Sequence, residues 1–287
     1  MKTKRIIESV IHAIFLILGL ITVACVLLIS IYLIVAGIPA ISKIGIVKFL
    51  FGTKWAPTYA SPEYGTLPFI LTSIYGTCGA IVIGVPIGFF CAVYLSKVAS
   101  KKVKNIVGHA ISMLAGIPSV VYGLVGMLIL VPGIRKIFHV PDGSSLLAAM
   151  IVLAIMILPS IIKVSITSLD AVPKEYEDAS LALGANEIET YFRVSVTAAK
   201  SGIITSIVLG VGRAIGEAMA VMMVSGNVPN MPKLCESVRF LTTAVASEMS
   251  YAAGLQRQAL FSIALVLFVF IMLINACLNL FLNKETK

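Results

Sequence analysis

The sequence contains little charge, and this absence limits what the protein can be. Only 12% of its 287 residues are charged, whereas 59% are hydrophobic and the mean hydropathy is +1.04. A soluble domain usually has about 25% charged residues. The composition therefore indicates an integral membrane protein. The net charge of +9 does not indicate nucleic-acid binding, because the basic residues lie mostly between apolar runs, where they orient a membrane protein.

The sequence also lacks the motifs of an enzyme. No lysine follows a glycine and precedes Ser or Thr, so the phosphate-binding loop of ATPases is missing. The histidines are scattered without metal-ligand spacing, and four of the five cysteines fall inside apolar runs, where they act as packing residues. We therefore expect no catalytic site, no metal and no cofactor. The three histidines are His12, His109 and His139, and the four cysteines inside apolar runs are Cys25, Cys78, Cys91 and Cys277.

Six apolar runs are long enough to cross a membrane, since a hydrocarbon core of about 30 Å takes about 20 helical residues. Lipid offers no partner to backbone groups, so runs of this length must be helices. The first run is longer than the core of a signal peptide and is interpreted as a retained helix. The sequence thus predicts an all-α, polytopic membrane protein with spans near 10–38, 67–96, 107–132, 145–169, 201–224 and 258–282.

Lysine and arginine set the expected orientation. They are more numerous in the N-terminus and the segments that would share its side than in the other loops, and "SKVASKKVKN" between the second and third runs is the strongest contribution. Such residues favour the cytoplasmic side. Both termini are therefore expected in the cytoplasm.

Two runs contain proline in a glycine-rich setting, "GVPIGFF" around Pro86 and "LAGIPSVVYG" around Pro118. Interrupted helices at membrane depth are tolerated where they line a cavity or pack against protein. An ordinary proline kink is the alternative. On the first interpretation, Ser119 and Tyr122 become candidates for the lining of a substrate pathway.

The stretch "GVGRAIGEAMA" places Arg213 and Glu217 inside an apolar run. A charge near the bilayer centre costs about 2.5–3.5 kcal/mol, so these side chains must face protein or water. Their spacing of four puts them on one helix face, where they could pair. Gly212, Gly216 and Ala220 form a small-residue face beside them that would allow another helix to approach closely. The pair is interpreted either as a structural ion pair or as part of an anion pathway, because a guanidinium is a planar, permanently charged donor to anionic oxygens.

Residues 170–200 are too polar for the membrane but carry apolar side chains on both sides of a glycine. Two short helices around a glycine turn would present these side chains to the cytoplasm as a docking element. A solvated amphipathic loop is the alternative.

"EDASLALGAN" followed by "RVSVTAAKSG" resembles the coupling motif of ABC-importer permeases, which docks on the ATPase. Asp178, Ala179 and Ser180 match its acidic and small positions, Gly184 matches its glycine, and Glu177 lies directly before them. The chain has Val-Thr where the family often has Leu-Pro. The resemblance favours the docking interpretation for residues 170–200, which we name the coupling loop.

Further segments, in the expected order, make the chain similar to phosphate-importer permeases of the PstC type. They are "FLFGTKWAP", "YGTLPFILTSIYGT", "GVPIGFFCAVYLS", "LAGIPSVVYG", "GVGRAIGEAMAVMMVSGN" and "ALFSIALVLFVF". The resemblance implies a type I (MetI-like) permease fold, with residues 1–66 as a tail, first helix and external loop and residues 67–283 as the permease domain.

The same resemblance implies a function, a location and partners. We expect a non-enzymatic subunit that conducts phosphate across the bacterial cytoplasmic membrane. Its partners would be a second permease of the PstA type, two ATP-binding subunits and an extracytoplasmic phosphate-binding protein, with membrane lipid around it. A permease for sulfate or molybdate is an alternative, and an ion-coupled secondary carrier is another from a different class.

Overall fold

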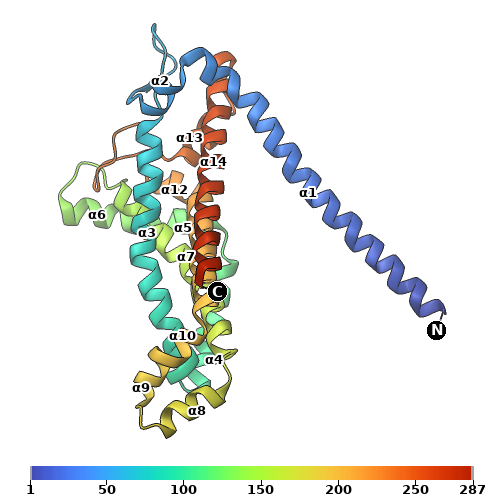
Figure 1. The fold of residues 1–287 in the computed structure, drawn as a ribbon. Coiled ribbons are helices and arrows are strands. Elements are labelled where there is room, and N and C mark those ends of the chain that lie inside the picture. The colour runs from blue at the N-terminus through green and yellow to red at the C-terminus, as the bar shows by residue number, and fades with distance from the viewer. Residues whose placement is uncertain (1, 286–287) are drawn as a thin grey trace.

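The computed structural model describes the backbone of residues 2–285 and the side chains of residue 8 and residues 10–276. The chain is predominantly helical, as the sequence predicts, and its long helices run alongside one another except for α1 (Figure 1). The long helices are α1 (Lys2–Ile44), α3 (Leu67–Val93), α7 (Leu146–Asp170), α11 (Lys200–Gly216) and α14 (Gly254–Glu285).

Shorter elements lie at the two ends of this bundle and at its centre (Figure 1). One end, here named the coupling end, carries η1 (Tyr94–Val98), α4 (Lys101–Gly116), α8 (Lys174–Ala182), α9 (Glu187–Thr190), η3 (Tyr191–Ser195) and α10 (Val196–Ala198). The opposite end carries α2 (Ile46–Phe51), the antiparallel strands β1 (Trp55–Ala56) and β2 (Glu63–Tyr64), and α13 (Leu241–Glu248). Between the ends lie α5 (Ser119–Val125), η2 (Gly126–Leu130), α6 (Val131–Phe138) and α12 (Met219–Val224).

In the described part of the chain, five helices are long and apolar enough to span a membrane. A sixth span results if the bent pair Glu187–Ala198 and Lys200–Gly216, which meet at 71°, is counted as one. The count of five to six is close to the six expected runs, and the run that contains no single helix of span length is 201–224, which is divided between α11 and α12.

The third expected span, 107–132, is not one continuous helix. α4 ends at Gly116, Ile117 is extended with φ −70° and ψ 129°, and the span-length segment runs from Ser119 to Phe138. Pro118 causes the break, because proline disfavours the helical conformation of the residue before it. Pro86, by contrast, lies inside α3, which continues through it.

The centre of the bundle is formed where α3 and α11 pack on α7. Ile157 and Ile161 of α7 are each 1% exposed and lie directly against glycines of the neighbouring helices. A Cβ atom would lie 2.9 Å from Ile157 at Gly84, 2.9 Å from Ile161 at Gly88 and 3.2 Å from Ile161 at Gly210. Small residues allow this close approach, which stabilises helix association in a membrane through van der Waals contact.

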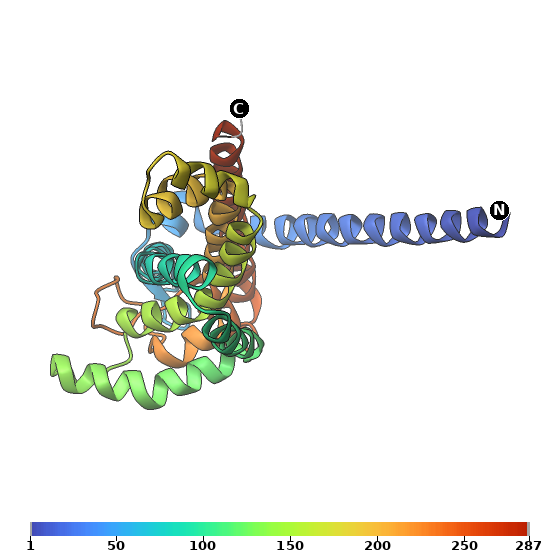
Figure 2. The ribbon, with the colours of Figure 1, turned by 90° about the horizontal axis from the view of Figure 1, so that it is seen from below.

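The first helix leaves the bundle. Figure 2 shows α1 extending sideways, and its contacts with the rest of the chain lie toward its C-terminal end. There Ser262 of α14 donates a 2.5 Å hydrogen bond to the carbonyl oxygen of Gly37, and Tyr32 packs edge-to-face on Phe261. The preceding apolar side chains from Val10 onward are exposed on all sides, which requires a nonpolar environment such as lipid or another membrane helix.

Candidate substrate pathway and coupling loop

The helix that carries Arg213 stops before Glu217. α11 ends at Gly216, and Glu217 is extended with φ −72° and ψ 130°. α12 begins two residues later, and the Glu217 carboxylate accepts a 3.0 Å hydrogen bond from the backbone N–H of Ala220. The hydroxyl of Thr242, in α13, donates a 2.7 Å bond to the carbonyl oxygen of Glu217. The break is therefore held by hydrogen bonds to both the side-chain carboxylate and the main-chain carbonyl oxygen of Glu217.

This geometry corrects the expected pairing of Arg213 with Glu217. Spacing of four places two residues on one face only while the helix continues, and here it does not. Among residues 10–276, no ion pair or hydrogen bond joins the two side chains, both of which are half-buried. Within the described residues, the two side chains are therefore held by other contacts or none, and not by each other.

The Arg213 guanidinium has no hydrogen-bond or ion-pair partner within the described residues. The Tyr122 hydroxyl of α5 donates a 2.7 Å bond to the carbonyl oxygen of Leu114 across the break at Pro118. α5 packs on α12 just beyond the break at Glu217, where a Cβ atom at Gly123 would lie 2.8 Å from the Cα atom of Ala220. Ser119, at the start of α5, is half-buried and lies one turn before Tyr122.

The expected small-residue face is also divided by the break. Gly212 and Gly216 are exposed, and a Cβ atom at either position would have no neighbour within 4 Å. Ala220 lies beyond the break and is fully buried, with its Cα 2.8 Å from where a Cβ of Gly123 would stand. Ala220 therefore serves packing between α5 and α12, whereas the two glycines leave one side of α11 open.

The coupling loop forms two short helices around a glycine turn, as the sequence predicts. Gly184 has φ +90°, a conformation that side-chain-bearing residues rarely adopt. Asn186 caps α9 in a reciprocal arrangement with Glu189, which fixes the start of the second helix. Leu183 and Ile188, on either side of the turn, are 90% and 69% exposed. The turn therefore presents apolar side chains outward at the coupling end.

The coupling-motif residues do not all face the same way. Asp178 and Ala179 are exposed, while the Ser180 hydroxyl lies 2.9 Å from that of Thr190 and joins α8 to α9. Glu177 is turned inward and binds Lys97 and Ser195. Asp178 and Ala179 are thus available to a partner, whereas Ser180 and Glu177 hold the loop together.

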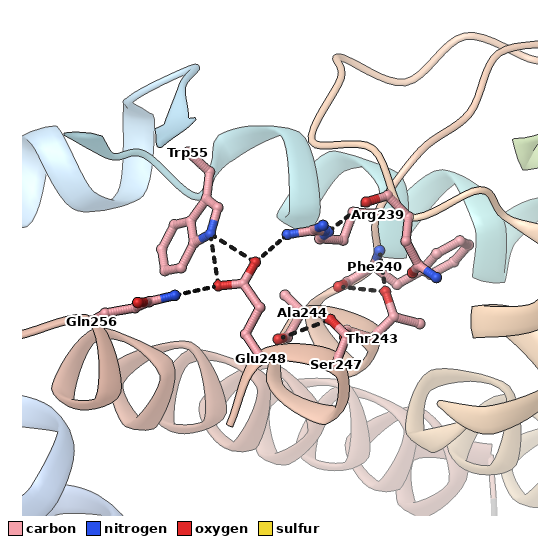
Figure 3. A network of polar contacts seen from close by, with 9 residues as sticks. Trp55, Arg239, Phe240, Thr243, Ala244, Ser247, Glu248 and Gln256 are labelled. Atoms are coloured by element: carbon pink, nitrogen blue, oxygen red, sulfur yellow. Dashed lines mark hydrogen bonds and ion pairs between the residues drawn. The ribbon is translucent and has the colours of Figure 1, made fainter. Parts of the chain in front are cut away.

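A polar cluster at the opposite end was missed by sequence reasoning (Figure 3). Glu248, 4% exposed at the end of α13, forms an ion pair with Arg239 and accepts a 2.9 Å bond from Gln256 of α14. The indole N–H of Trp55 lies 3.2 Å from both carboxylate oxygens. Arg239 also donates to the carbonyl oxygen of Asn227 and stacks over an aromatic ring. The only residue that could have indicated this cluster from the sequence is Trp55, the single tryptophan of the chain. Its hydrogen-bond partner Glu248 is 193 residues away in sequence.

Solved structures share this arrangement of a membrane bundle with interrupted helices at its centre and an exposed helix–turn–helix at one end. The fold is similar to a chain of the inward-facing MetNI methionine ABC transporter, with a TM-score of 0.57 at 18% identity, covering 78% of this chain and 95% of that one. A chain of an amino acid ABC transporter gives a TM-score of 0.54 at 20% identity and covers 76% and 92%.

The chain belongs to the family of inner membrane components of binding-protein-dependent transport systems, whose model matches residues 84–284. It is 38% identical over 266 residues to the probable ABC transporter permease YqgH of Bacillus subtilis, covering 90% of this chain and 86% of that protein. It is 33% identical to the phosphate transport system permease protein PstC of Pasteurella multocida, covering 84% and 81%. The protein is thus a membrane-embedded permease subunit that works with ATP-binding and substrate-binding proteins.

Proposed function

We propose that this chain conducts inorganic phosphate in an ATP-driven importer, with Arg213 as the group that binds the anion in transit. The observation that carries the proposal is the half-buried Arg213 guanidinium, which has no hydrogen-bond partner among the described residues and lies next to a helix break. A charge in a membrane helix faces a polar cavity or a partner. Relatives named phosphate transport system permease proteins, from bacteria such as Pasteurella multocida and Haemophilus influenzae, support phosphate as that anion.

The chemistry of the two breaks fits a transient anion site. Guanidinium offers planar, bidentate and permanently charged donors to phosphate oxygens. Tyr122 adds a hydroxyl at the break near Pro118, and Ser119 lies on the same short helix. The Glu217 carboxylate accepts a hydrogen bond from the N–H of Ala220 and so fixes the start of α12. It also adds a negative charge that offsets the positive charge of Arg213. This balance lets the anion bind and leave again.

The remaining assembly follows from the same proposal. Leu183 and Ile188 would dock on one of two ATP-binding subunits, together with Asp178 and Ala179. The open side of Gly212 and Gly216 would receive a homologous second permease of the PstA type, and an extracytoplasmic binding protein would deliver phosphate. Residues 1–66 would form the tail, first helix and external loop, and residues 67–283 the permease domain.

The test is radiolabelled uptake in proteoliposomes that contain the purified complex, its binding protein and ATP. We expect phosphate uptake that excess sulfate or molybdate does not inhibit. Inhibition by either anion would identify an oxyanion permease of another specificity. Phosphate uptake by this chain alone, driven by an ion gradient, would contradict the importer assignment.

A further inference from the structure

Two π-helices bring donors to one carboxylate at the coupling end. Lys97 lies in η1, which continues α3, and its Nζ atom is 2.5 Å from the Oε1 atom of Glu177 in α8. Ser195 lies in η3, and its hydroxyl donates to the same oxygen at 2.7 Å. π-helices are rare and occur frequently at functional sites, because the extra residue redirects a side chain.

The arrangement is buried, although it lies at the edge of the bundle. The side chains of Lys97 and Glu177 are 9% and 19% exposed. Lys97 donates a second bond, of 3.0 Å, to the carbonyl oxygen of Leu169 near the end of α7. Burial raises the pKa of the Glu177 carboxyl, but the hydrogen bonds from Lys97 and Ser195 and the charge of Lys97 outweigh it and hold the pKa below its usual value. The carboxylate is therefore ionised at neutral pH.

α8 is joined to α7 by only three residues, because α7 ends at Asp170 and α8 begins at Lys174. α8 buries no residue of its own, and Ser180 joins it to α9 rather than to a long helix. A neighbouring ion pair, Lys104 with Asp170 at 2.7 Å, joins α4 to α7 without involving α8, and its side chains are 35% and 40% exposed. The chain thus joins α8 to α7, and the Lys97–Glu177 pair joins α8 to η1 at the end of α3, while the Lys97 bond to Leu169 ties η1 to α7.

We propose that Lys97 and Glu177 are positioning residues that transmit movement of the coupling loop to α3 and α7. If the ATP-binding subunit moves α8, the buried pair forces η1 and the end of α7 to follow, because separating the two charges leaves both unpaired in a poorly solvated site. α7 and α3 form the packed centre of the bundle, against which α11 with Arg213 also lies. The pair therefore connects ATP hydrolysis with the anion pathway, and this inference rests on the proposed importer function.

The experiment compares substrate transport with ATP hydrolysis in the assembled complex in proteoliposomes. In Lys97→Met, which keeps the length of the stem and removes the charge, we expect the number of anions moved per ATP hydrolysed to fall at least about fivefold, the lower limit of typical coupling between two sites. Glu177→Gln should have the same effect. A pair that served stability alone would change the amount of assembled complex but leave the ratio intact.

Lys104→Met is the matched control, and its ratio should equal that of the unmodified complex. If Lys97→Met does not assemble, Glu177→Asp supplies the measurement, since the shorter side chain keeps the charge but cannot reach both donors; its ratio should fall also. An unchanged ratio in an assembled Lys97→Met or Glu177→Asp complex overturns the proposal. If the unmodified complex moves another anion instead of phosphate, only the proposed substrate is wrong, and the ratio measured with that anion still tests the pair.

Discussion

The Thr242 hydroxyl donates a 2.7 Å hydrogen bond to the carbonyl oxygen of Glu217, at the point where the helix carrying Arg213 ends. Thr242 is at the start of α13, and Glu248, with its buried polar cluster, is at the end of the same helix. α13 therefore connects the helix break in the proposed pathway with the fixed structure at the opposite end.

Thr242→Val removes the hydroxyl while keeping the shape of the side chain. The carbonyl oxygen of Glu217 then loses its partner in a site that is 9% exposed at Thr242, and an unsatisfied buried group costs about 1–3 kcal/mol. We expect phosphate uptake per assembled complex to fall several-fold. Thr205→Val is the control, because the Thr205 hydroxyl bonds within α11 on an exposed face. Equal uptake in the two variants would show that the bond to Glu217 does not hold the break.

Glu248→Ala leaves Arg239 buried without its counter-charge and removes the acceptor of Trp55 and Gln256. Removal of one member of a buried ion pair typically costs about 3–5 kcal/mol. We expect a clearly lower midpoint of thermal unfolding in detergent. Glu236→Ala is the control, since its pair with Lys233 is exposed and worth about 0–1 kcal/mol. A midpoint as high as that of the control would mean that the cluster contributes little.

Gly184→Leu places a side chain at φ +90°, where a residue with a Cβ is strained by at least about 1–2 kcal/mol. The turn between α8 and α9 should distort, and the ATP-binding subunit should no longer co-purify, although the protein still inserts in the membrane. Gly108→Leu in α4 is the matched control, because that glycine is helical and has open space around it. Normal co-purification and uptake in Gly184→Leu would remove the coupling role of the turn.

The orientation of the chain is tested by thiol labelling of intact cells. Cys235 lies in the loop between α12 and α13, away from the coupling end, and should react with a membrane-impermeant reagent from outside. A cysteine in place of Lys101, at the start of α4, should react only after the membrane is opened. The reverse pattern would put the coupling loop on the outside and exclude its docking on an ATPase.

The sequence predicts those parts of the molecule that depend on local chemistry. Run length predicts five of the six spans, and the glycine at 184 predicts a turn that requires positive φ. Proline in a glycine-rich setting does not by itself distinguish the break at 118 from the continuous helix at 86. The break at Glu217 was not predicted, because the bond that holds it comes from Thr242, 25 residues later. The spacing of Arg213 and Glu217 in an apolar run is typical of a pair on a continuous helix. Nothing in the neighbouring residues indicates that a contact from α13 ends the helix between them.

The last prediction distinguishes a transport role for Arg213 from a packing role. Arg213→Gln removes the charge but no ion pair or hydrogen bond within the described residues, so the complex should assemble normally. Phosphate uptake per assembled complex should nevertheless be nearly abolished, and Arg213→Lys should restore only part of it, because an ammonium group cannot bind two phosphate oxygens in a planar, bidentate manner. Glu217→Gln is the matched variant: its amide oxygen can still accept from the N–H of Ala220, so any loss of uptake reports the charge and not the helix break. Near-normal uptake in Arg213→Gln, measured with radiolabelled phosphate in cells that lack other phosphate importers, would move the search for the anion site to the break between Leu114 and Tyr122.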